Sequence, residues 1–363
     1  MKFTCERNII LKEISMAQEI VASKNVISVL SYIYLEAEND VLIIRAKDLK
    51  VNFETKIPVT VAETGSATVL GGIFLGILSS VPEGEMEFEH KDGKLKIKSS
   101  VKKASSQLKS IESDKFKEIP VSNTEYFEIP VKDFKKMINQ TVFAVSDDET
   151  RYFMNGVYIE KNDSKLTMVS TDGRRLAFIE KDVGLKIDFP GIIVHPKILN
   201  IISKRTGDEG LIAISITDKM IFVRFGSYSL SSLLIEGQFP NYRKVIPEEQ
   251  EKSLTVKRLE MLEAIRYVSN LVEQKYKRIY LGLRPGVMDI YSEVEVGDAK
   301  IEVPCNYEGE ETTLAFNYQY IEEPFKAIES DEVRILFTGP SKAITVKPVP
   351  DADFFHIVMT MQS

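Results

Sequence analysis

The sequence predicts an α+β protein made of three similar domains, and two observations lead to that prediction. First, the segments Ile33-Tyr34-Leu35, Val157-Tyr158-Ile159 and Ile279-Tyr280-Leu281 share one character and begin 124 and 122 residues apart. The similarity continues at the same spacing in Leu42, Leu166 and Met288, and in Asp48 and Asp172. Second, each third of the chain contains segments with apolar residues at helical spacing, and these alternate with strand-like runs joined by short turns. Self-similarity at a fixed period indicates one repeated structural unit, and short turns between strands indicate antiparallel sheets.

The first third shows the clearest element patterns. Apolar residues from Ile10 to Val21 recur at helical spacing and predict a helix from Arg7 to Val21. Strands are expected over 30–36, 41–45 and 51–61, followed by an apolar helix over 71–80. The alternating runs 86–90 and 94–98 are separated by Lys91-Asp92-Gly93, and an Asp-Gly pair in that place is a strong hairpin signal.

The second third repeats this order from about Ile129, with basic faces on both of its helices. The first helix has an apolar stripe of Phe134, Met137, Ile138 and Thr141. Another face of the same helix carries Lys132, Lys135, Lys136 and Asn139. The second helix follows His195-Pro196, since proline is well tolerated at the start of a helix. On that helix Lys197, Asn200 and Lys204 lie opposite Ile198, Leu199 and Ile202.

The last third begins near Leu254 and again contains two helices. The first carries Lys257, Arg258 and Arg266, and the second is expected from about Asn317 to Ser330. Polar, proline-containing stretches at 110–123 and 247–252 have the composition of linkers. We therefore expect domains over residues 1–122, 123–250 and 251–363, each of ordinary size for a domain with its own core.

Bulk composition indicates a globular protein of a reducing compartment. The 363 residues are 44% hydrophobic and 28% charged, and Cys5 and Cys305 are the only cysteines. This composition argues against disorder and against a disulfide framework, so a cytoplasmic location is expected. No signal peptide and no membrane span are expected, because charges interrupt the N-terminal segment and every apolar run is short. The formal net charge of −7 argues against nucleic-acid binding over the whole surface, while one local basic face stays possible.

Little in the sequence points to catalysis. His90, His195 and His356 are the only histidines, and none is near a cysteine, so neither a metal site nor a cofactor is expected. The run Gly71–Gly76 matches a phosphate loop only loosely and lies on an expected helix. One alternative stays open, a metal-dependent nuclease that uses Asp147, Asp148, Glu149 and Asp172. A repeat scaffold unrelated to DNA is the other alternative.

Several short motifs resemble one family along the whole chain. They are Arg151-Tyr152-Phe153-Met154-Asn155-Gly156, Thr171-Asp172-Gly173-Arg174-Arg175-Leu176-Ala177 and Phe239-Pro240-Asn241-Tyr242-Arg243-Lys244-Val245. The opening Met1-Lys2-Phe3-Thr4, the pair Phe316-Asn317 with Tyr320, and the ending Val358-Met359-Thr360-Met361 complete the set. Together these motifs resemble the bacterial DNA polymerase III beta subunit, the sliding clamp.

The resemblance implies the DNA clamp fold and a function without catalysis. In that family three similar domains form each chain, and two chains close head to tail into a ring around duplex DNA. Helices line the ring interior and antiparallel sheets form the outside. The implied function is to tether the replicative polymerase to DNA and so confer processivity. The implied partners are a second copy of the chain, duplex DNA without sequence preference, the polymerase alpha subunit, the clamp loader, and other polymerases and repair proteins that dock through short linear peptides; no membrane partner is implied.

The resemblance also implies three sets of site residues. The implied DNA-facing residues are Lys24, Lys132, Lys135, Lys136, Asp148, Tyr152, Phe153, Lys197, Lys204, Lys257, Arg258 and Arg266. The implied peptide pocket consists of Met154, Thr171, Gly173, Arg174, Arg175, Leu176, Pro240, Lys244, Val245, Tyr276, Asn317, Tyr320, Ile357, Val358, Met359, Thr360 and Met361. The implied dimer contacts are Ser106 and Leu108 on one side and Leu271 and Val272 on the other.

This chain departs from the family pattern at several of these positions. Thr360 stands where proline is common, and Gln362-Ser363 replaces a frequent Arg-Leu ending. Arg174 replaces a frequent His, and Lys244 replaces a frequent Arg, which exchanges a planar fork for a point charge. We therefore expect the pocket to persist with a different peptide preference. Gly72 and Ile73 stand where basic residues often occur, which weakens the expected DNA contacts of the first domain.

Overall fold

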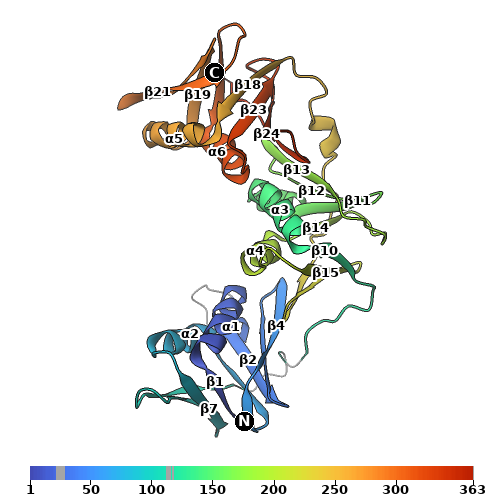
Figure 1. Ribbon diagram of the computed structural model, residues 1–363, viewed down its shortest axis with the longest axis vertical. Helices are drawn as coiled ribbons and strands as arrows, with labels where there is room; N and C mark the ends of the chain where they lie inside the picture. The colour runs from blue at the N-terminus through green and yellow to red at the C-terminus, as the bar shows by residue number, and fades with distance from the viewer. Residues whose placement is uncertain (22–28, 112–115, 117, 363) are drawn as a thin grey trace. The chain divides into compact units, whose positions relative to one another are not determined.

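The computed structural model describes residues 1–21, 29–111, 116 and 118–362, and these form two compact units (Figure 1). Unit 1 contains Met1–Ile129 and Glu209–Leu234, and unit 2 contains Pro130–Asp208 and Ile235–Ser363. Lys24, one of the expected DNA-facing residues, lies outside the described residues. The expected domain boundaries at 122 and 250 stay a prediction.

In its described residues, unit 1 contains two antiparallel sheets and two α-helices. The helices are α1 (Arg7–Ile20) and α2 (Gly71–Ser80). The strands are β1 (Lys2–Glu6), β2 (Tyr32–Glu38), β3 (Val41–Lys47), β4 (Val51–Pro58), β5 (Thr60–Glu63), β6 (Gly65–Leu70), β7 (Glu85–Lys91), β8 (Lys94–Ser99), β9 (Ser105–Lys109), β10 (Phe127–Pro130), β15 (Leu211–Ile216), β16 (Met220–Phe225) and β17 (Tyr228–Leu233). Within the described residues, one sheet has the order β5-β1-β7-β8-β9, and the other has the order β10-β15-β16-β17-β4-β3-β2-β6.

Helices α1 and α2 pack against each other in unit 1. The helix α1 buries Ile10, Ile14 and Ala17, which are the residues that its periodicity placed on one face. Gly71 begins α2 because a side chain there would overlap with Gln18 Oε1 and come within 2.9 Å of Ile33 Cδ1. The glycine therefore permits close packing of the helix on its neighbours, as the sequence indicated, rather than forming a phosphate loop.

Unit 2 combines four helices with one large sheet in its described residues. The helices are α3 (Val131–Thr141), α4 (Pro196–Arg205), α5 (Arg258–Val268) and α6 (Tyr318–Ala327). The strands are β11 (Val157–Asn162), β12 (Lys165–Thr171), β13 (Arg175–Asp182), β14 (Ile192–Val194), β18 (Lys252–Lys257), β19 (Arg278–Arg284), β20 (Val287–Val294), β21 (Gly297–Asn306), β22 (Thr312–Asn317), β23 (Glu332–Phe337), β24 (Ile344–Val349) and β25 (Phe354–Val358). They are ordered β14-β11-β12-β13-β25-β24-β23-β18-β21-β20-β19-β22.

The helices of unit 2 pack in pairs, α3 with α4 and α5 with α6 (Figure 1). The apolar stripes expected on α3 and α4 are confirmed, since Phe134, Met137, Ile198 and Leu199 are all buried. His195 caps α4 because its Nδ1 accepts a hydrogen bond of 3.1 Å from the backbone N–H of Lys197. On α3 and α4 the apolar stripes therefore face the core, while Lys132 and Lys204 stay exposed.

Most expected elements are confirmed, and the errors concern their ends. The strand expected over 51–61 is wrong as one element, because β4 ends at Pro58 and β5 starts at Thr60. The helix expected to continue to Ser330 ends at Ala327, where the cap residue Ile328 has extended dihedral angles. The strand β9 gave no clear pattern in the sequence, since its five residues contain a single apolar side chain, Leu108. Among the described residues, no helix is both long enough and apolar enough to cross a membrane.

Candidate functional site

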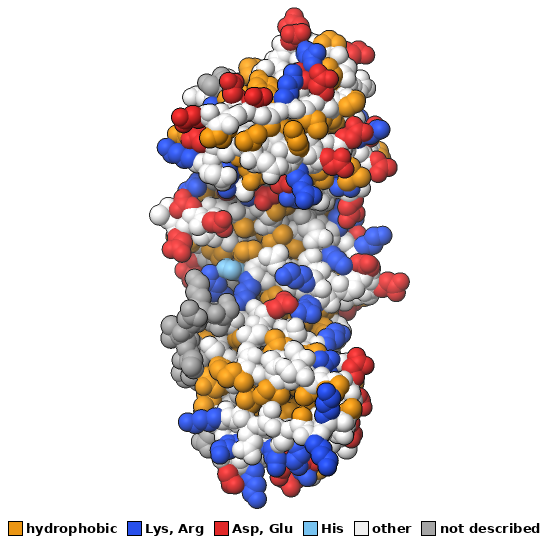
Figure 2. Space-filling view, turned by 90° about the vertical axis from the view of Figure 1, so that its left-hand side faces the viewer, with side chains coloured by type: hydrophobic (Ala, Val, Ile, Leu, Met, Phe, Trp, Pro, Cys, Tyr) orange, Lys and Arg blue, Asp and Glu red, His pale blue; other side chains and the backbone are white. Residues whose placement is uncertain are grey.

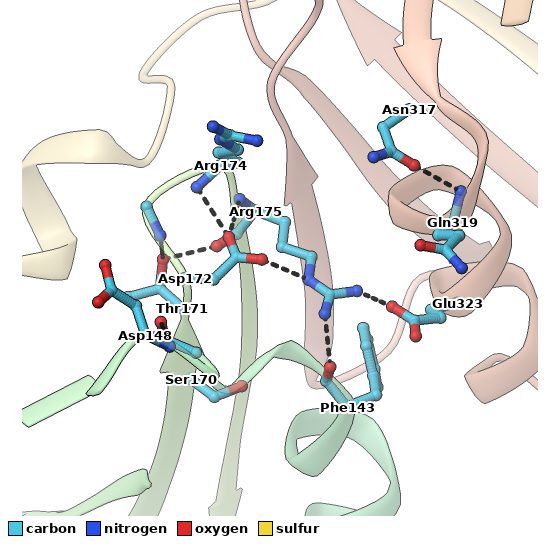
Figure 3. Close-up of polar contacts among 12 residues, drawn as sticks. Phe143, Asp148, Ser170, Thr171, Asp172, Arg174, Arg175, Asn317, Gln319 and Glu323 are labelled. Atoms are coloured by element: carbon cyan, nitrogen blue, oxygen red, sulfur yellow. Dashed lines mark hydrogen bonds and ion pairs between the residues drawn. The ribbon is translucent and has the colours of Figure 1, made fainter. Parts of the chain in front are cut away.

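The site begins with a tight turn between β12 and β13. The carboxylate Oδ1 of Asp172 accepts hydrogen bonds from the backbone N–H groups of Arg174 (2.8 Å) and Arg175 (3.1 Å), and Thr171 Oγ1 donates to the Arg175 carbonyl (2.6 Å) (Figure 3). Gly173 has a φ of +87°, a conformation that a side chain disfavours. The turn Thr171–Arg175 is therefore held rigidly by its own residues, and Asp172 is fully engaged in holding it.

Arg175 connects this turn to two helical segments. Its Nε lies 3.0 Å from Asp172 Oδ2, its Nη2 donates to the Phe143 carbonyl (2.8 Å), and its Nη1 pairs with Glu323 of α6 (Figure 3). Its guanidinium also lies 4.8 Å from the ring centre of Tyr320. Because planar guanidinium groups fit carboxylates with fixed geometry, Arg175 acts as a rigid connection among these elements.

The C-terminal tail, residues 359–362 after β25, completes the site. The strand β25 pairs with β13, after which Met359 N–H donates to the Arg174 carbonyl (2.9 Å) and Met361 N–H donates to the Ala315 carbonyl (2.8 Å). The tail therefore borders a hollow of about 410 Å³. Its lining includes seven of the residues expected in a peptide pocket: Arg174, Tyr276, Asn317, Tyr320, Met359, Thr360 and Met361. The remaining lining residues, Lys275, Arg278 and Gln362, were missed by the sequence reasoning.

A second, more polar hollow of about 430 Å³ shares Arg174 and Tyr320 with the first. Arg175 also lines it, together with Arg151, Gln319 and Glu323, which the sequence reasoning did not select. The other lining residues are Val145, Ser146, Asp147 and Asp172. The turn and α6 therefore border two adjoining hollows with different polarity.

The other expected pocket residues do not line the first hollow. Leu176 and Ile357 belong to a buried apolar cluster that also includes Tyr242. Met154 and Val358 are buried as well. Lys244 and Val245 are exposed on the 3-10 turn η5 (Tyr242–Val245), and Pro240 precedes it half-buried. Tyr242, which begins this turn, thus packs in the same apolar cluster as Ile357 of β25.

The missed residues had one signal in the sequence. Lys275-Tyr276-Lys277-Arg278 is a basic run around one aromatic residue, and its last residue begins β19. Such a run is ordinary on a surface, and only tertiary structure brings it beside Tyr320 and Met361. Sequence spacing could not have placed these segments together, because they are joined only through the β19–β22 pairing and the tail.

The basic residues expected to face DNA have two kinds of environment. Lys132, Lys204, Lys257 and Arg266 are exposed, whereas Lys197 and Arg258 are half-buried. Lys135 pairs with Asp208 (2.9 Å), and Lys136 pairs with Asp353 (3.0 Å). Figure 2 shows Lys and Arg side chains together with a band of hydrophobic side chains on the N-terminal unit. In that unit α2 exposes Ile73, at a position where the family often has a basic residue.

The acidic loop is organised by hydrogen bonds. Asp148 accepts from the hydroxyl of Thr150 (2.6 Å), from Arg151 Nε (2.8 Å) and from the backbone N–H of Thr150 (2.9 Å), and these partners lower the pKa of its carboxyl group to about 2. Nearby, Tyr152 is exposed, while Phe153 packs against the apolar cluster. Asp148 and Asp172 are each paired with an arginine. In the described part of the chain, no three His, Cys, Asp or Glu side chains are grouped to hold a metal ion.

The expected dimer residues lie on two different kinds of element. Ser106 and Leu108 are half-buried on β9, which forms an edge of its sheet in the described residues. Leu271 ends the 3-10 turn η6 (Ser269–Leu271) and is half-buried, while Val272 is buried. Val272 therefore exposes little surface for a dimer contact, and Leu271 is the more accessible of the two.

Comparison with known proteins gives one consistent result. The N-terminal, central and C-terminal domains of the DNA polymerase III beta subunit match residues 1–122, 128–241 and 243–362 respectively. A beta sliding clamp from Treponema pallidum is 43% identical, with both chains fully covered. A solved DNA polymerase sliding clamp from Pseudomonas aeruginosa has a TM-score of 0.91 and 26% identity, again with both chains fully covered. A C. crescentus beta sliding clamp, solved with polyethylene glycol at a region assigned to beta-motif tethering, has a TM-score of 0.90 and 26% identity, with 100% of this chain and 99% of the other covered.

These matches support the sliding-clamp interpretation of the sequence and neither of its alternatives, the nuclease and the non-DNA scaffold. The chain therefore belongs to the DNA polymerase III beta subunit family, and it is a sliding clamp, a processivity subunit without catalytic activity of its own.

Proposed function

We propose that two copies of this chain close into a ring around duplex DNA and tether the replicative polymerase to it. In this proposal each chain contributes domains over 1–122, 123–250 and 251–363, and the ring works in the cytoplasm. The observation that carries the proposal is the pairing of helices α1–α2, α3–α4 and α5–α6, once in each third of the chain. Six such pairs around one hole would present helices to the DNA and leave the sheets outside.

The proposed DNA contact is weak and independent of sequence. Lys132 on α3, Lys204 on α4 and Arg266 on α5 supply exposed positive charge, although the chain as a whole carries −7. Lys257 is also exposed, but it ends β18 and pairs with Glu260 (3.3 Å). Lysine and arginine contacts to phosphates act without base recognition and are screened by salt. A closed ring does not need to bind DNA tightly, because it cannot dissociate from a circular duplex without opening. Lys135 and Lys136 already neutralise aspartates, so we assign them a smaller share of the DNA contact than Lys132 and Lys204.

The hollow beside the tail is the proposed docking site for partner peptides. Met359, Met361 and Tyr320 offer apolar surface that adapts to different side chains, and Asn317 offers polar groups that orient a ligand. We assign the polymerase alpha subunit, the clamp loader, and other polymerases and repair proteins to this site, each through a short linear segment. A partner held there would stay near the primer end at an effective concentration that reaches about the millimolar range.

Retention on DNA tests this proposal directly. A clamp loader places the purified chain on nicked circular DNA, and the amount of chain retained after gel filtration at 0.1 M and 0.5 M NaCl is compared with the amount retained after the same DNA is linearised. We expect retention on the circle at both salt concentrations and loss from the linear form. Equal loss from both forms would contradict the ring. As a control, a circle without loader present reports how much of the protein closes on DNA unaided.

A further inference from the structure

Unit 1 has a hollow of its own, about 380 Å³ in volume, that the proposed ring function does not use. Its floor comes from the strands β3, β4, β16 and β17, and its wall comes from residues 118–126, the crossing segment. All of its lining residues belong to unit 1, so it is separate from the two hollows around the turn Thr171–Arg175. A hollow that combines apolar surface with a few polar groups is a candidate binding site.

A row of polar side chains forms the floor of this hollow. Arg45 of β3 lies opposite Glu54 of β4, and the two side chains pair at 2.7 Å. Ser229 of β17 lies opposite Glu54 on one side and opposite Arg224 of β16 on the other. Residues that are directly opposite in a sheet present their side chains on the same face. The row therefore begins with an arginine that has a carboxylate partner and ends with Arg224.

The crossing segment is attached to the sheet on both sides of residues 118–121. Ser122 Oγ and Thr124 Oγ1 each lie 2.6 Å from Oγ of Ser215, a buried residue of β15. Just before the segment, the ring of Phe116 is buried, and Nζ of Lys47 on β3 lies 5.1 Å from its centre. Because β4, β17 and β16 lie between β3 and β15, the chain passes over these three strands. The hollow is therefore formed by the fold itself, before any ligand binds.

The second copy of the repeated unit fills the corresponding place with a ring of its own. The strands β12 and β13 begin and end 124 residues after β3 and β4. Phe239 and Tyr242 stand 123 residues after Phe116 and Ile119. In unit 2 the side chain of Tyr242 is buried in the apolar cluster with Phe239 and with Val169 of β12. The fold thus accommodates an aromatic ring at this place, and in unit 1 the smaller Ile119 stands there instead.

Arg224 is the cation of the floor that no carboxylate neutralises. Its guanidinium lies 4.4 Å from the centre of the ring of Tyr126, in the crossing segment. Among the described residues, no Asp or Glu lies within ion-pair distance of Arg224, whereas Arg45 contacts both Glu36 and Glu54. An arginine that an aromatic ring holds in place presents its donors in a fixed direction, which suits a carboxylate.

The crossing segment favours a peptide over other ligands. Its residues 118–121 make no backbone hydrogen bond within the described part of the chain, so these groups are open to an extended peptide. Glu118 is exposed and lines the same hollow. Its negative charge repels a nucleic acid, which carries a phosphate at every nucleotide, more than it repels a peptide with one carboxylate.

We propose that the hollow of unit 1 is a second docking site, which takes an extended segment of a partner protein with an aromatic residue next to a carboxylate. The aromatic ring lies against Ile119, Val121 and Phe222, in the role that Tyr242 has in unit 2. The carboxylate pairs with Arg224. A volume of about 380 Å³ accommodates one ring and its neighbours rather than a folded domain. This site goes beyond the proposed ring and its hollow beside the tail, and depends on neither.

Photo-crosslinking with the full-length chain tests where such a segment binds. The probe is Ac-Ser-Asp-Bpa-Ser-NH2, in which Bpa is benzoylphenylalanine, and its counterpart has Asn in place of Asp. Labelled residues are located by mass spectrometry over a range of peptide concentrations at 50 mM NaCl, where charge pairs are weakly screened. We expect labelling within 118–126 and 222–231, and the Asp peptide should reach half-maximal labelling at a concentration about five- to tenfold lower than the Asn peptide. Labelling beside the C-terminal tail is scored separately.

Substitutions at two positions assign the charge and the ring. Arg224→Gln makes the Asp and Asn peptides label the hollow equally, and Arg224→Lys keeps part of the difference. Ile119→Tyr supplies the ring from the chain itself and lowers labelling by both peptides about tenfold, because two rings cannot share one place. Ile119→Leu leaves labelling unchanged. The matched control is Arg243→Gln in unit 2, because Arg243 is also an exposed arginine over a tyrosine, 4.7 Å from the Tyr242 ring centre. It makes the same change in net charge and leaves labelling of the hollow unchanged.

The outcomes separate this site from every other assignment. Labelling of the parent chain only beside the tail, or equal labelling of the hollow by the Asp and Asn peptides, overturns the proposal. Circular dichroism on heating shows that each variant is folded, and if Ile119→Tyr is not, the comparison of Arg224→Gln with Arg224→Lys still decides. If a ten-residue oligothymidylate displaces the Asp peptide from the hollow at equal concentration, the site serves nucleic acid and the proposal is overturned. Retention on circular DNA tests the ring independently, so either can fail without the other.

Discussion

Arg174 and Arg175 are adjacent in the sequence but have opposite surroundings. Arg175 is largely buried and ion-pairs with Asp172 and Glu323, while Arg174 is exposed and directs its side chain away from that network (Figure 3). Successive residues at the start of a strand point to opposite sides, which explains the contrast. The buried arginine therefore maintains the architecture of the site, and the exposed one is available to a ligand.

Replacement of Arg175 tests this difference. We expect Arg175→Gln to lower the free energy of unfolding by about 3 kcal/mol, because it leaves the carboxylates of Asp172 and Glu323 without their cation in a partly buried site. Peptide affinity should fall with it, since the turn loses its connection to α6. Urea unfolding followed by circular dichroism measures the loss. Arg174→Gln is the control and should change stability by less than about 0.5 kcal/mol; equal effects of the two substitutions would contradict the assignment.

The burial of His356 predicts that the free energy of unfolding depends on pH. It is fully buried on β25, its Nε2 lies 3.0 Å from Gln140 Oε1, and burial lowers the pKa of its imidazole to about 3. Gln140 Nε2 donates to the Ala327 carbonyl, so its Oε1 accepts and His356 Nε2 donates. Since the unfolded imidazole takes up a proton near pH 6.5 and the folded one does not, stability from this group is complete above pH 6.5 and declines as the pH falls toward 3.

The comparison with His356→Gln isolates this contribution. The substitution keeps a hydrogen-bond donor but removes the titration. Between pH 7.5 and pH 5, we expect the parent to lose about 2 kcal/mol more unfolding free energy than the variant. Urea unfolding at both pH values measures this difference. Parallel losses in the two proteins would show that His356 does not titrate as its burial requires.

At the scale of residues, the turn Thr171–Arg175 could be predicted from the sequence, but the residues that lie near it in space could not. Thr171, Gly173 and Arg175 belong to one continuous motif, so the resemblance could place them together. Arg278 could not be selected in this way, because its place beside the hollow depends on Tyr276, on the strand β22 next to it and on the tail. Buried polar pairs such as His356 and Gln140 were also invisible, since they lie 216 residues apart in the chain.

At the scale of elements, periodicity was informative where one face of an element is buried and weak at exposed edges. The α3 and α4 stripes were predictable because core packing selects apolar residues every three or four positions. The strand β9 was not, because it is an edge with alternating exposed and half-buried residues and a single apolar side chain. The split between β4 and β5 was missed because apolar alternation continues through Val59 while the backbone pairing changes partner.

The helix α2 offers a matched pair of glycine substitutions. Gly76 is exposed inside the helix, and an added methyl group would meet no atom within 4 Å. Gly76→Ala should therefore raise the free energy of unfolding by about 0.5–1 kcal/mol, because alanine loses less backbone entropy. Gly71→Ala should lower it by a similar amount, because its methyl group would overlap with Gln18 Oε1. Thermal unfolding at one protein concentration measures both, and a gain in both variants would contradict the packing role of Gly71.

At the scale of the whole molecule, closing a ring requires a surface that joins two copies, and β9 has a suitable backbone. Ser110 N–H donates to the Gly93 carbonyl (2.8 Å), and the Ala104 carbonyl accepts from Ser99 N–H (3.2 Å), so even-numbered residues turn their backbone groups toward β8. Because alternate residues of an antiparallel strand face alternate neighbours, the backbone groups of Ser105, Gln107 and Lys109 point outward. Among the described residues, β9 has no second strand partner, so these groups are free to pair with a strand of another chain.

A proline at Gln107 separates this pairing from the fold of the subunit. Gln107→Pro removes an outward N–H but keeps every bond to β8, and proline is tolerated on edge strands. If the homodimer forms by strand addition at β9, the parent should have about twice the chain mass of 41.1 kDa in sedimentation at micromolar concentration, and the variant should approach the mass of one chain. Gln107→Ala, which retains the N–H, should sediment like the parent. A variant that is monomeric should also lose retention on circular DNA while its peptide affinity is unchanged, because the hollow beside the tail lies in the other unit. A Gln107→Pro protein that remains dimeric would place the closing surface elsewhere than on the outward edge of β9.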